Sequence, residues 1–81
     1  IQPNPSEDGF FDLHATVIKD SKLSIIIYDI YGRTIFTDSW SANAGNHIFD
    51  IDLSTQASGV YIMELSNEHS IVRKMKMIKS K

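Results

Sequence analysis

The sequence predicts an all-β fold, a two-sheet antiparallel β-sandwich of about seven short strands. Three observations support this prediction. Segments rich in β-branched and aromatic residues recur along the 81-residue chain, and such residues fit a pleated, half-buried surface. Glycine and polar residues typical of turns separate the segments. No stretch has the periodicity of a long amphipathic helix, so the strands must bury their apolar faces against one another.

The central element is the run from Leu23 to Phe36, the longest apolar and β-branched segment of the chain. It is broken once, between Asp29 and Arg33, where Gly32 can adopt the positive φ of a tight turn. The run therefore predicts a hairpin with strands over residues 22–30 and 33–38. Because both faces of the first strand carry apolar residues, we expect that strand in the middle of a sheet.

The neighbouring elements follow from alternation. Residues 11–15 form the first predicted strand, since apolar and polar residues alternate there. Residues 39–46 are predicted as the longest loop, small and polar except for Trp40. The clearest alternation then predicts a strand over residues 48–53 with one face in water. Its apolar face comprises Phe49, Ile51 and Leu53.

Residues 53–61 predict a short crossover followed by a new strand. Ser54 is placed to cap a short helical turn and Gly59 to end it. A leucine, a crossover, a glycine and a strand-initiating tyrosine, here Tyr61, resemble the tyrosine corner of immunoglobulin-like sandwiches, in which the phenol hydrogen-bonds back to the crossover backbone. The predicted fold class is therefore an immunoglobulin-like antiparallel β-sandwich, completed by a last strand over residues 70–78.

Charge is distributed unevenly, although the net charge is only −2. The last nine residues carry five Lys or Arg and no acid, a charge of +5, whereas the rest of the chain carries −7. Two interpretations are open. The basic residues protect a solvated edge strand against aggregation, or they form a docking strand with a basic face.

No catalytic, cofactor-binding or metal-ligating residue is expected. The chain has no cysteine, which excludes disulfides and thiol catalysis. His14, His47 and His69 are not at metal-ligand spacing, and Asp50 and Asp52 would need distant loops to bind calcium. No serine lies in a nucleophile elbow, and no phosphate-binding glycine loop is present. The acidic bulk disfavours nucleic acid, and no apolar run is long enough for membrane insertion.

Four motifs occur in order along the chain. They are Pro3-Asn4-Pro5 with Gly9-Phe10-Phe11, Tyr28-Asp29 with Gly32-Arg33, Asp52-Leu53-Ser54 with Ser58-Gly59-Val60-Tyr61, and Arg73-Lys74-Met75-Lys76-Met77-Ile78. Each alone is a weak signal, but together they resemble the type A C-terminal sorting domains of the bacterial type IX (Por) secretion system. Gln2 and Gln56 depart from the family's pattern, which bears on local packing only.

The resemblance implies one sorting domain, residues 1–81, that belongs to a larger secreted protein, and the lack of an initiating methionine points the same way. It implies a non-catalytic signal that directs cargo from the periplasm across the outer membrane to the cell surface. The implied partners are an outer-membrane translocon, a shuttle protein and a sortase. The sortase cuts upstream of the domain, and the cargo is attached to lipopolysaccharide or released. No cofactor is implied.

The motif residues divide into two groups. Recognition by the secretion machinery is expected at the basic residues of the last strand, Arg73, Lys74, Lys76 and Lys79. A mainly structural role is expected for the other motif residues, Asn4, Pro5, Gly9, Asp29, Gly32, Arg33, Gly59 and Tyr61. An exposed terminal strand would also allow an excised domain to dimerise.

Two other functions are consistent with a β-sandwich. One is an immunoglobulin- or fibronectin-like accessory module that binds carbohydrate or a protein partner. Trp40 and Tyr31 would favour stacking on a sugar if both were exposed near each other. The other is a structural spacer, whose deletion would leave the location of the cargo unchanged.

Overall fold

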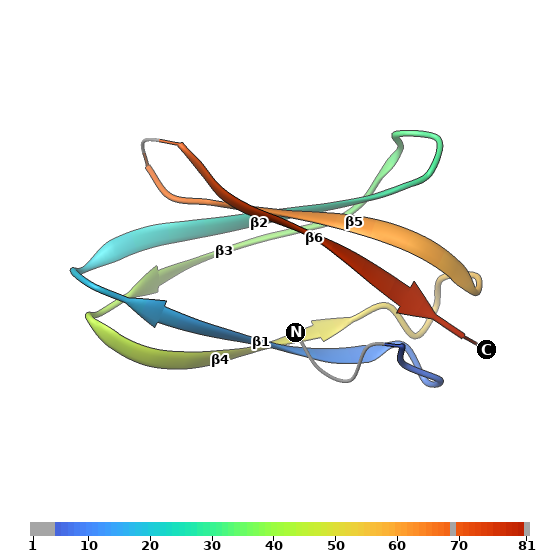
Figure 1. Cartoon of the computed structure of the whole chain (residues 1–81), viewed down its shortest axis with the longest axis horizontal. Helices are drawn as coiled ribbons and strands as arrows, with labels where there is room; N and C mark the ends of the chain where they lie inside the picture. Colours follow the sequence, from blue (N-terminus) through green and yellow to red (C-terminus); the bar gives the residue numbers. More distant parts are fainter. Residues whose placement is uncertain (1–4, 69, 81) are drawn as a thin grey trace.

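The computed structural model describes residues 5–68 and 70–80, which form six strands and no helix. The strands are β1 (Phe10–Val17), β2 (Ser21–Asp29), β3 (Thr34–Ala42), β4 (Gly45–Asp52), β5 (Gly59–Ser66) and β6 (Ile71–Lys79). They build two antiparallel sheets, one of β1 and β4 and one in the order β3-β2-β5-β6, stacked as two layers (Figure 1). The predicted all-β sandwich is confirmed, with six strands in the described residues instead of about seven.

The strand predicted to be central does lie inside a sheet. β2 pairs antiparallel with β3 on one side and with β5 on the other. Its inward side chains, Leu23, Ile25 and Ile27, are buried, and Ile27 is 0% exposed. Its outward side chains, among them Ile26 and Tyr28, lie on the outer face of the four-stranded sheet and are partly accessible. β2 is therefore stabilised by hydrogen bonds along both edges and by apolar contacts on its inner face.

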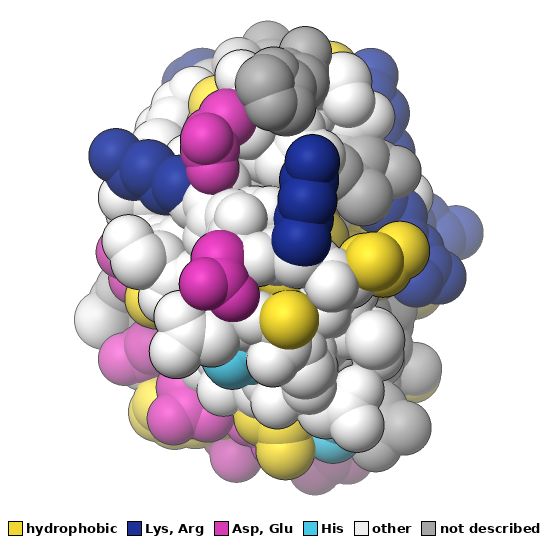
Figure 2. Space-filling model, turned by 90° about the vertical axis from the view of Figure 1, so that its left-hand side faces the viewer, with side chains coloured by type: hydrophobic (Ala, Val, Ile, Leu, Met, Phe, Trp, Pro, Cys, Tyr) yellow, Lys and Arg dark blue, Asp and Glu magenta, His cyan; other side chains and the backbone are white. Residues whose placement is uncertain are grey.

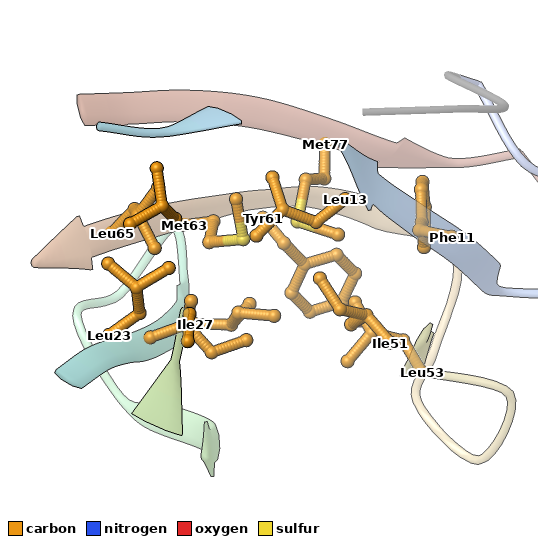
Figure 3. Packing of buried hydrophobic residues seen from close by; sticks show 13 residues of the cluster. Phe11, Leu13, Leu23, Ile27, Ile51, Leu53, Tyr61, Met63, Leu65 and Met77 are labelled. Carbon is orange, nitrogen blue, oxygen red and sulfur yellow. The ribbon is translucent and has the colours of Figure 1, made fainter. Parts of the chain in front are cut away.

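The hydrophobic core lies between the two sheets (Figure 3). Every strand contributes at least one buried side chain, because successive side chains of a strand point to opposite faces. The cluster consists of Phe11, Leu13, Val17, Leu23, Ile25, Ile27, Ala42, Ile51, Leu53, Tyr61, Met63, Leu65 and Met77. The same alternation leaves Asp12, Asp50 and Asp52 exposed on the outer face of the two-stranded sheet.

The prediction of a long loop over residues 39–46 is wrong. β3 continues to Ala42 and β4 begins at Gly45, so a two-residue connection joins them. The polar run stays extended because its backbone pairs with the start of β2. Trp40 stacks on Phe49 with the ring centroids 4.2 Å apart, which joins β3 to β4 across the side of the sandwich. Pairing and stacking outweigh the low strand propensity of small polar residues.

Residues 53–58 form a hydrogen-bonded turn instead of the predicted helical turn. The N–H of Gln56 donates to the carbonyl of Leu53 at 3.0 Å, and the N–H of Ser54 donates to Asp52 Oδ1 at 2.9 Å. The N–H groups of Ser54 and Gln56 thus find hydrogen-bond acceptors in neighbouring residues of the chain. The described residues include no helix of the length and apolarity that a membrane span requires.

The segment before β1 pairs with the end of β6. Ser6 forms a parallel bridge with Lys79. The N–H of Ser6 donates to the carbonyl of Ile78 at 2.8 Å, and the N–H of Ser80 donates to the carbonyl of Ser6 at 2.9 Å. Ser6 is 1% exposed. The described beginning and end of the chain therefore lie side by side.

Candidate recognition surface

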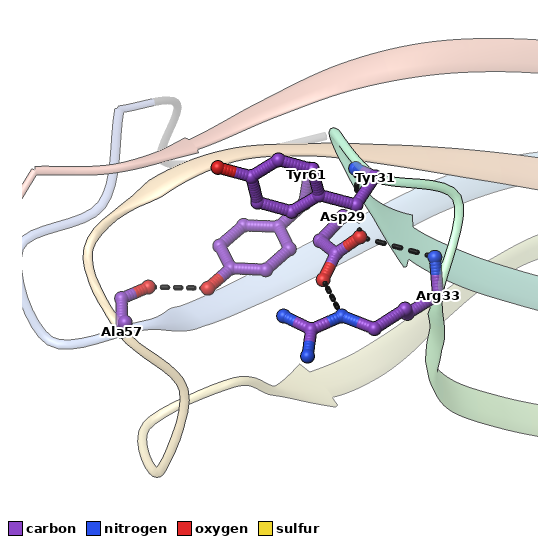
Figure 4. A network of polar contacts seen from close by, with 5 residues as sticks. All are labelled: Asp29, Tyr31, Arg33, Ala57 and Tyr61. Atoms are coloured by element: carbon purple, nitrogen blue, oxygen red, sulfur yellow. Dashed lines mark hydrogen bonds and ion pairs between the residues drawn. The ribbon is translucent and has the colours of Figure 1, made fainter.

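The turn between β2 and β3 is organised by the carboxylate of Asp29 (Figure 4). Its Oδ1 accepts the N–H groups of Tyr31 at 2.9 Å and Arg33 at 3.0 Å, and its Oδ2 lies 2.8 Å from Arg33 Nε. Gly32 supplies a φ of 83° and donates its N–H to the carbonyl of Asp29. Asp29, Gly32 and Arg33 therefore act as one unit that closes the turn.

We expect the domain to lose stability as the pH falls below about 4. Burial raises the pKa of Asp29, but hydrogen bonds from the backbone and side chain of Arg33 and from Tyr31 outweigh it, so the pKa lies below its ordinary value of 3.8. The pKa values of Asp8 and Asp52 are lowered too, by hydrogen bonds from the Phe10 backbone and from Ser54 respectively. Because the folded state holds these protons less tightly, protonation favours the unfolded chain.

The variant Asp29→Asn tests this dependence, because an amide oxygen still accepts the two backbone N–H groups but does not titrate. Its melting temperature should fall less than that of the parent chain between about pH 6 and pH 3. Thermal unfolding followed by circular dichroism across that range measures the difference. Identical profiles would exclude Asp29 as a source of the acid sensitivity.

Tyr61 forms the predicted tyrosine corner, which is confirmed. Its hydroxyl donates to the carbonyl of Ala57 in the crossover (Figure 4). The residue is 5% exposed and belongs to the core. The ring therefore packs against apolar side chains while the hydroxyl has a hydrogen-bond acceptor. Gly59, between these two residues, is the first residue of β5. The corner fixes the crossover to the four-stranded sheet.

Part of the opening motif lies outside the described residues. Asn4 is among the residues not described, and Pro5 is exposed. Gly9 has a φ of 85°, and its carbonyl accepts the N–H of Leu53 at 2.8 Å. A Cβ at residue 9 would lie 2.8 Å from the carbonyl oxygen of Leu53. Both the positive φ and the close backbone approach therefore require glycine at this position.

Ser6 has a role that the sequence did not reveal. Its Oγ accepts the N–H of Gly9 at 3.1 Å and lies 2.9 Å from Asp8 Oδ1 and 3.0 Å from the carbonyl oxygen of Phe10. The spacing of Ser6, Asp8 and Gly9 indicates a turn. No local signal points to the pairing with β6, because that contact joins opposite ends of the chain.

Three of the four predicted recognition residues are exposed on β6: Arg73, Lys74 and Lys76. Lys74 and Lys76 lie on the outer face of the four-stranded sheet, opposite Glu64 and Ile62 of β5. Lys74 Nζ is 3.2 Å from Glu64 Oε1, and the hydrogen bond between them raises the pKa of Lys74. The Tyr28 hydroxyl donates to the same carboxylate at 3.1 Å. A polar row therefore crosses β2, β5 and β6.

Lys79 does not belong to this exposed group, which corrects the expectation from sequence. It is 7% exposed and follows Met75 and Met77 on the inward side of β6. Its Nζ donates to the carbonyl of Ser54 at 2.9 Å and to that of Gln56. Buried ammonium groups need such partners in place of water. Lys79 therefore fixes the crossover to β6 and is not presented to a partner.

Trp40 and Tyr31 are not neighbours. Tyr31 lies in the turn that joins β2 to β3, whereas Trp40 lies near the far end of β3, opposite Leu23. Tyr31 is 79% exposed, and the Arg33 guanidinium lies 5.8 Å from its ring centroid. Trp40 is half-buried on Phe49. The arrangement that would favour sugar stacking, two exposed aromatic rings side by side, is not formed.

The described residues contain no group of three or more His, Asp or Glu side chains that could hold a metal ion. Asp50 and Asp52 point outward from β4, and His14 points outward from β1. His47 stacks on Phe49 with centroids 5.8 Å apart, and His69 is outside the described residues.

The four sequence motifs can be compared together with the families of known proteins. A family model for the secretion system C-terminal sorting domain matches residues 1–80. The chain belongs to this family. The sorting domain is therefore a C-terminal signal of type IX secretion, which implies a cargo that crosses the outer membrane to the cell surface and an interaction with the secretion machinery. The sorting-domain family is one of secretion signals and is not known for catalysis. No curated protein and no solved structure matches the chain.

Proposed function

We propose that this sorting domain is the last module of a larger secreted protein and that the type IX machinery binds it through the outer face of β6. The observation that carries this proposal is the exposure of Lys74 and Lys76 on an edge strand. Arg73 is exposed too, but it shares the inward register of Met75 and Met77 and does not lie on this outer face. Exposed charges on an edge strand are not needed for core packing, and an acidic partner surface can reach them.

The proposed route has three steps. The cargo first enters the periplasm, where the sorting domain folds. An outer-membrane translocon and a shuttle protein then bind the folded domain. A cell-surface sortase finally cuts upstream of the domain, and the cargo is attached to lipopolysaccharide or released. The burial and pairing of Ser6 support a cut before that residue, because a protease cannot reach a buried, hydrogen-bonded backbone without unfolding it.

Ser6 also limits how β6 is recognised. It occupies the outer edge of β6 at residues 78–80. A partner strand cannot be added at that end without displacing it. We therefore place the contact on the outward side chains of β6, and not on the backbone of its C-terminal end.

A transplant tests the proposed function. Residues 1–81 are fused to the C-terminus of a periplasmically targeted reporter in a bacterium with a working type IX system. We expect the reporter outside the cell, and inside when the translocon is deleted. A reporter that stays in the periplasm while the attached domain is folded would reject the signal function of this chain.

Reversal of the two outward lysines should block export without unfolding the domain. Lys74→Glu with Lys76→Glu alters exposed side chains but places a carboxylate opposite Glu64, so the stability should fall by about 1–2 kcal/mol, which a folded domain can tolerate. Export of the fused reporter and thermal unfolding of the purified domain are the two measurements. Normal export of the folded double variant would eliminate β6 as the recognised surface.

Two matched variants separate position from net charge. The pair Glu64→Lys with Lys74→Glu keeps an ion pair across β5 and β6 and keeps the net charge, but it moves the positive charge from β6 to β5. Export should fall if the charge on β6 itself is recognised. Lys22→Glu, an exposed reversal on β2, changes the net charge as a single β6 reversal does and should leave export unchanged.

A further inference from the structure

The two-stranded sheet has an open edge along β1. The carbonyl of Gly9 points to β4, where it accepts the N–H of Leu53. Alternate residues of a strand direct their backbone groups to opposite sides, so those of Asp12, His14 and Thr16 point away from β4. In residues 5–68 and 70–80, β4 is the only strand beside β1. The outward backbone groups of these three residues therefore face no strand in that part of the chain.

The edge is closed at one end only. Phe10 also directs its backbone away from β4, but its N–H donates to Asp8 Oδ1 at 3.0 Å and its carbonyl oxygen lies 3.0 Å from Ser6 Oγ. The side chains of Ser6 and Asp8 thus take the place of a neighbouring strand at Phe10. Toward Val17 no described side chain does the same. An added strand would therefore fit from Asp12 to the end of β1.

An apolar cavity of about 350 Å³ continues this open edge. It lies beneath the end of β1, where Val17, Leu23 and Leu65 form its apolar wall. Thr16, whose backbone points to the open edge, also lines it. The edge and the cavity are therefore continuous, and an added strand could place an apolar side chain in the cavity. Backbone hydrogen bonds with side-chain pockets beside them are the two requirements of strand addition.

The inward face of β6 is progressively uncovered toward the same end of the molecule. Met77 is 0% exposed, Met75 is half-buried and Arg73 is exposed, although all three share the inward register. Arg73 lies opposite Leu65 of the cavity wall. The two-stranded sheet is thus too narrow to cover β6, and a third strand beside β1 would cover it.

Positive charge lies at this end of the open edge. Lys19 lines the cavity, and neither its ammonium group nor the Arg73 guanidinium is in an ion pair within the described residues. Figure 2 views this end of the molecule, with basic side chains at the centre, along the right margin and at the upper left, and acidic ones mainly to the left and below. A carboxylate on the added segment would complement Lys19 and Arg73.

We propose that the open edge of β1 binds an extended segment of a partner protein as a third strand of this sheet. Its inward side chains are apolar, to fill the cavity and cover Met75. Its outward side chains are uncharged, because Asp12 and Asp50 make the adjoining outer face acidic. A carboxylate lies at the end that reaches Lys19. This surface is separate from the outer face of β6, so the proposal does not rest on the proposed function.

A tethered probe tests this surface. The peptide Glu-Thr-Val-Thr-Val-Thr-Glu, in which valine and glutamate share the inward face and threonine the outward face, is joined to the C-terminus of the full chain by a flexible Gly/Ser linker that can span β1. The linker gives an effective concentration on the order of 1 mM, so a weak natural affinity cannot hide the interaction. Carboxylates at both ends allow either strand direction. We expect amide exchange of His14 and Thr16, followed by NMR, to slow about tenfold relative to the chain without the probe.

Three variants control the result. His14→Pro removes an outward N–H at an edge position, where proline is tolerated, and should abolish the protection of Thr16. Ile48→Pro makes the matched change at an outward position of β4 and should leave the protection intact. If either proline variant is unfolded, Lys19→Glu with Arg73→Glu provides the test. This pair should lose protection with the glutamate probe and regain it with Lys-Thr-Val-Thr-Val-Thr-Lys.

Protection of β3, β4 or β6 amides in place of β1 would overturn the proposal, as would no protection at all with the tether present. Protection that is unchanged by the double charge reversal would overturn the requirement for a carboxylate. Protection of β1 in the chain without a probe, increasing with protein concentration, would assign the edge to a second copy of this chain and not to a different partner.

Discussion

Gly9→Ala should destabilise the sorting domain by about 2–5 kcal/mol, because backbone strain and overpacking act at the same residue. At a φ of 85° an alanine is strained, and its Cβ would lie 2.8 Å from the Leu53 carbonyl oxygen and 2.9 Å from Ser54 Cα. Both neighbours are backbone atoms, which cannot move aside as a flexible side chain can. For a domain of this size we expect the melting temperature to fall by about 10 °C or more.

Gly32→Ala is the matched control. Gly32 has nearly the same φ, 83°, but no atom lies within 4 Å of the position that a Cβ would occupy. The variant therefore experiences the strain without the collision, and its loss should be about 1–2 kcal/mol. Chemical denaturation of both variants measures the difference. Equal losses would contradict the close packing of Gly9 against Leu53.

Ile27→Ala should cost about 2–5 kcal/mol, because it removes a buried side chain from the central strand and leaves a cavity. Ile27 is 0% exposed and lies in the middle of β2, which is paired on both sides. The total stability of a small domain is about 5–15 kcal/mol. The variant should therefore unfold at a much lower denaturant concentration than the parent chain.

The adjacent residue provides the control. Ile26→Ala removes the same atoms from the same strand, but Ile26 is 39% exposed on the outer face of the sheet. Its loss should be clearly smaller than that of Ile27→Ala, because 39% of the residue surface stays in water when the strand folds. If the two variants were equally unstable, the assignment of the inward face of β2 would be wrong.

The strands with clear alternation could be predicted, because their pattern is local. β4 has the inward residues that its alternation identified, β2 lies inside a sheet as its two apolar faces indicated, and the tyrosine corner followed from the spacing of Gly59 and Tyr61. Residues 39–42 could not be assigned to β3 from their composition, since small polar residues gain strand structure here only from pairing with β2 and from the stack of Trp40 on Phe49. Such contacts join residues that are distant in sequence, and no local pattern reports them.

The exposure of the residues predicted for recognition shows the same limit of sequence analysis. Lys74 and Lys76 are exposed, and they alternate along β6 with the half-buried Met75 and the buried Met77. Lys79 has the same charge, but it lies one strand period beyond Met77 on the inward side. The carbonyls of Ser54 and Gln56 that bind it come from the crossover, so composition could not distinguish it from the outward lysines. The available signal was the alternation of inward and outward residues along β6, which places Lys79 on the same side as Met75 and Met77.

The pairing of Ser6 with residues 78 and 80 has a consequence for the order of synthesis. Translation makes Ser6 first, and its strand partners exist only after residue 80 has been added. Lys79, which holds the crossover, is made at the same late stage. A polypeptide interrupted before residue 78 lacks both contacts, so the beginning of the chain and the crossover are not fixed to β6. Machinery that binds only the closed domain would therefore export cargo whose translation has passed this point and leave interrupted products behind.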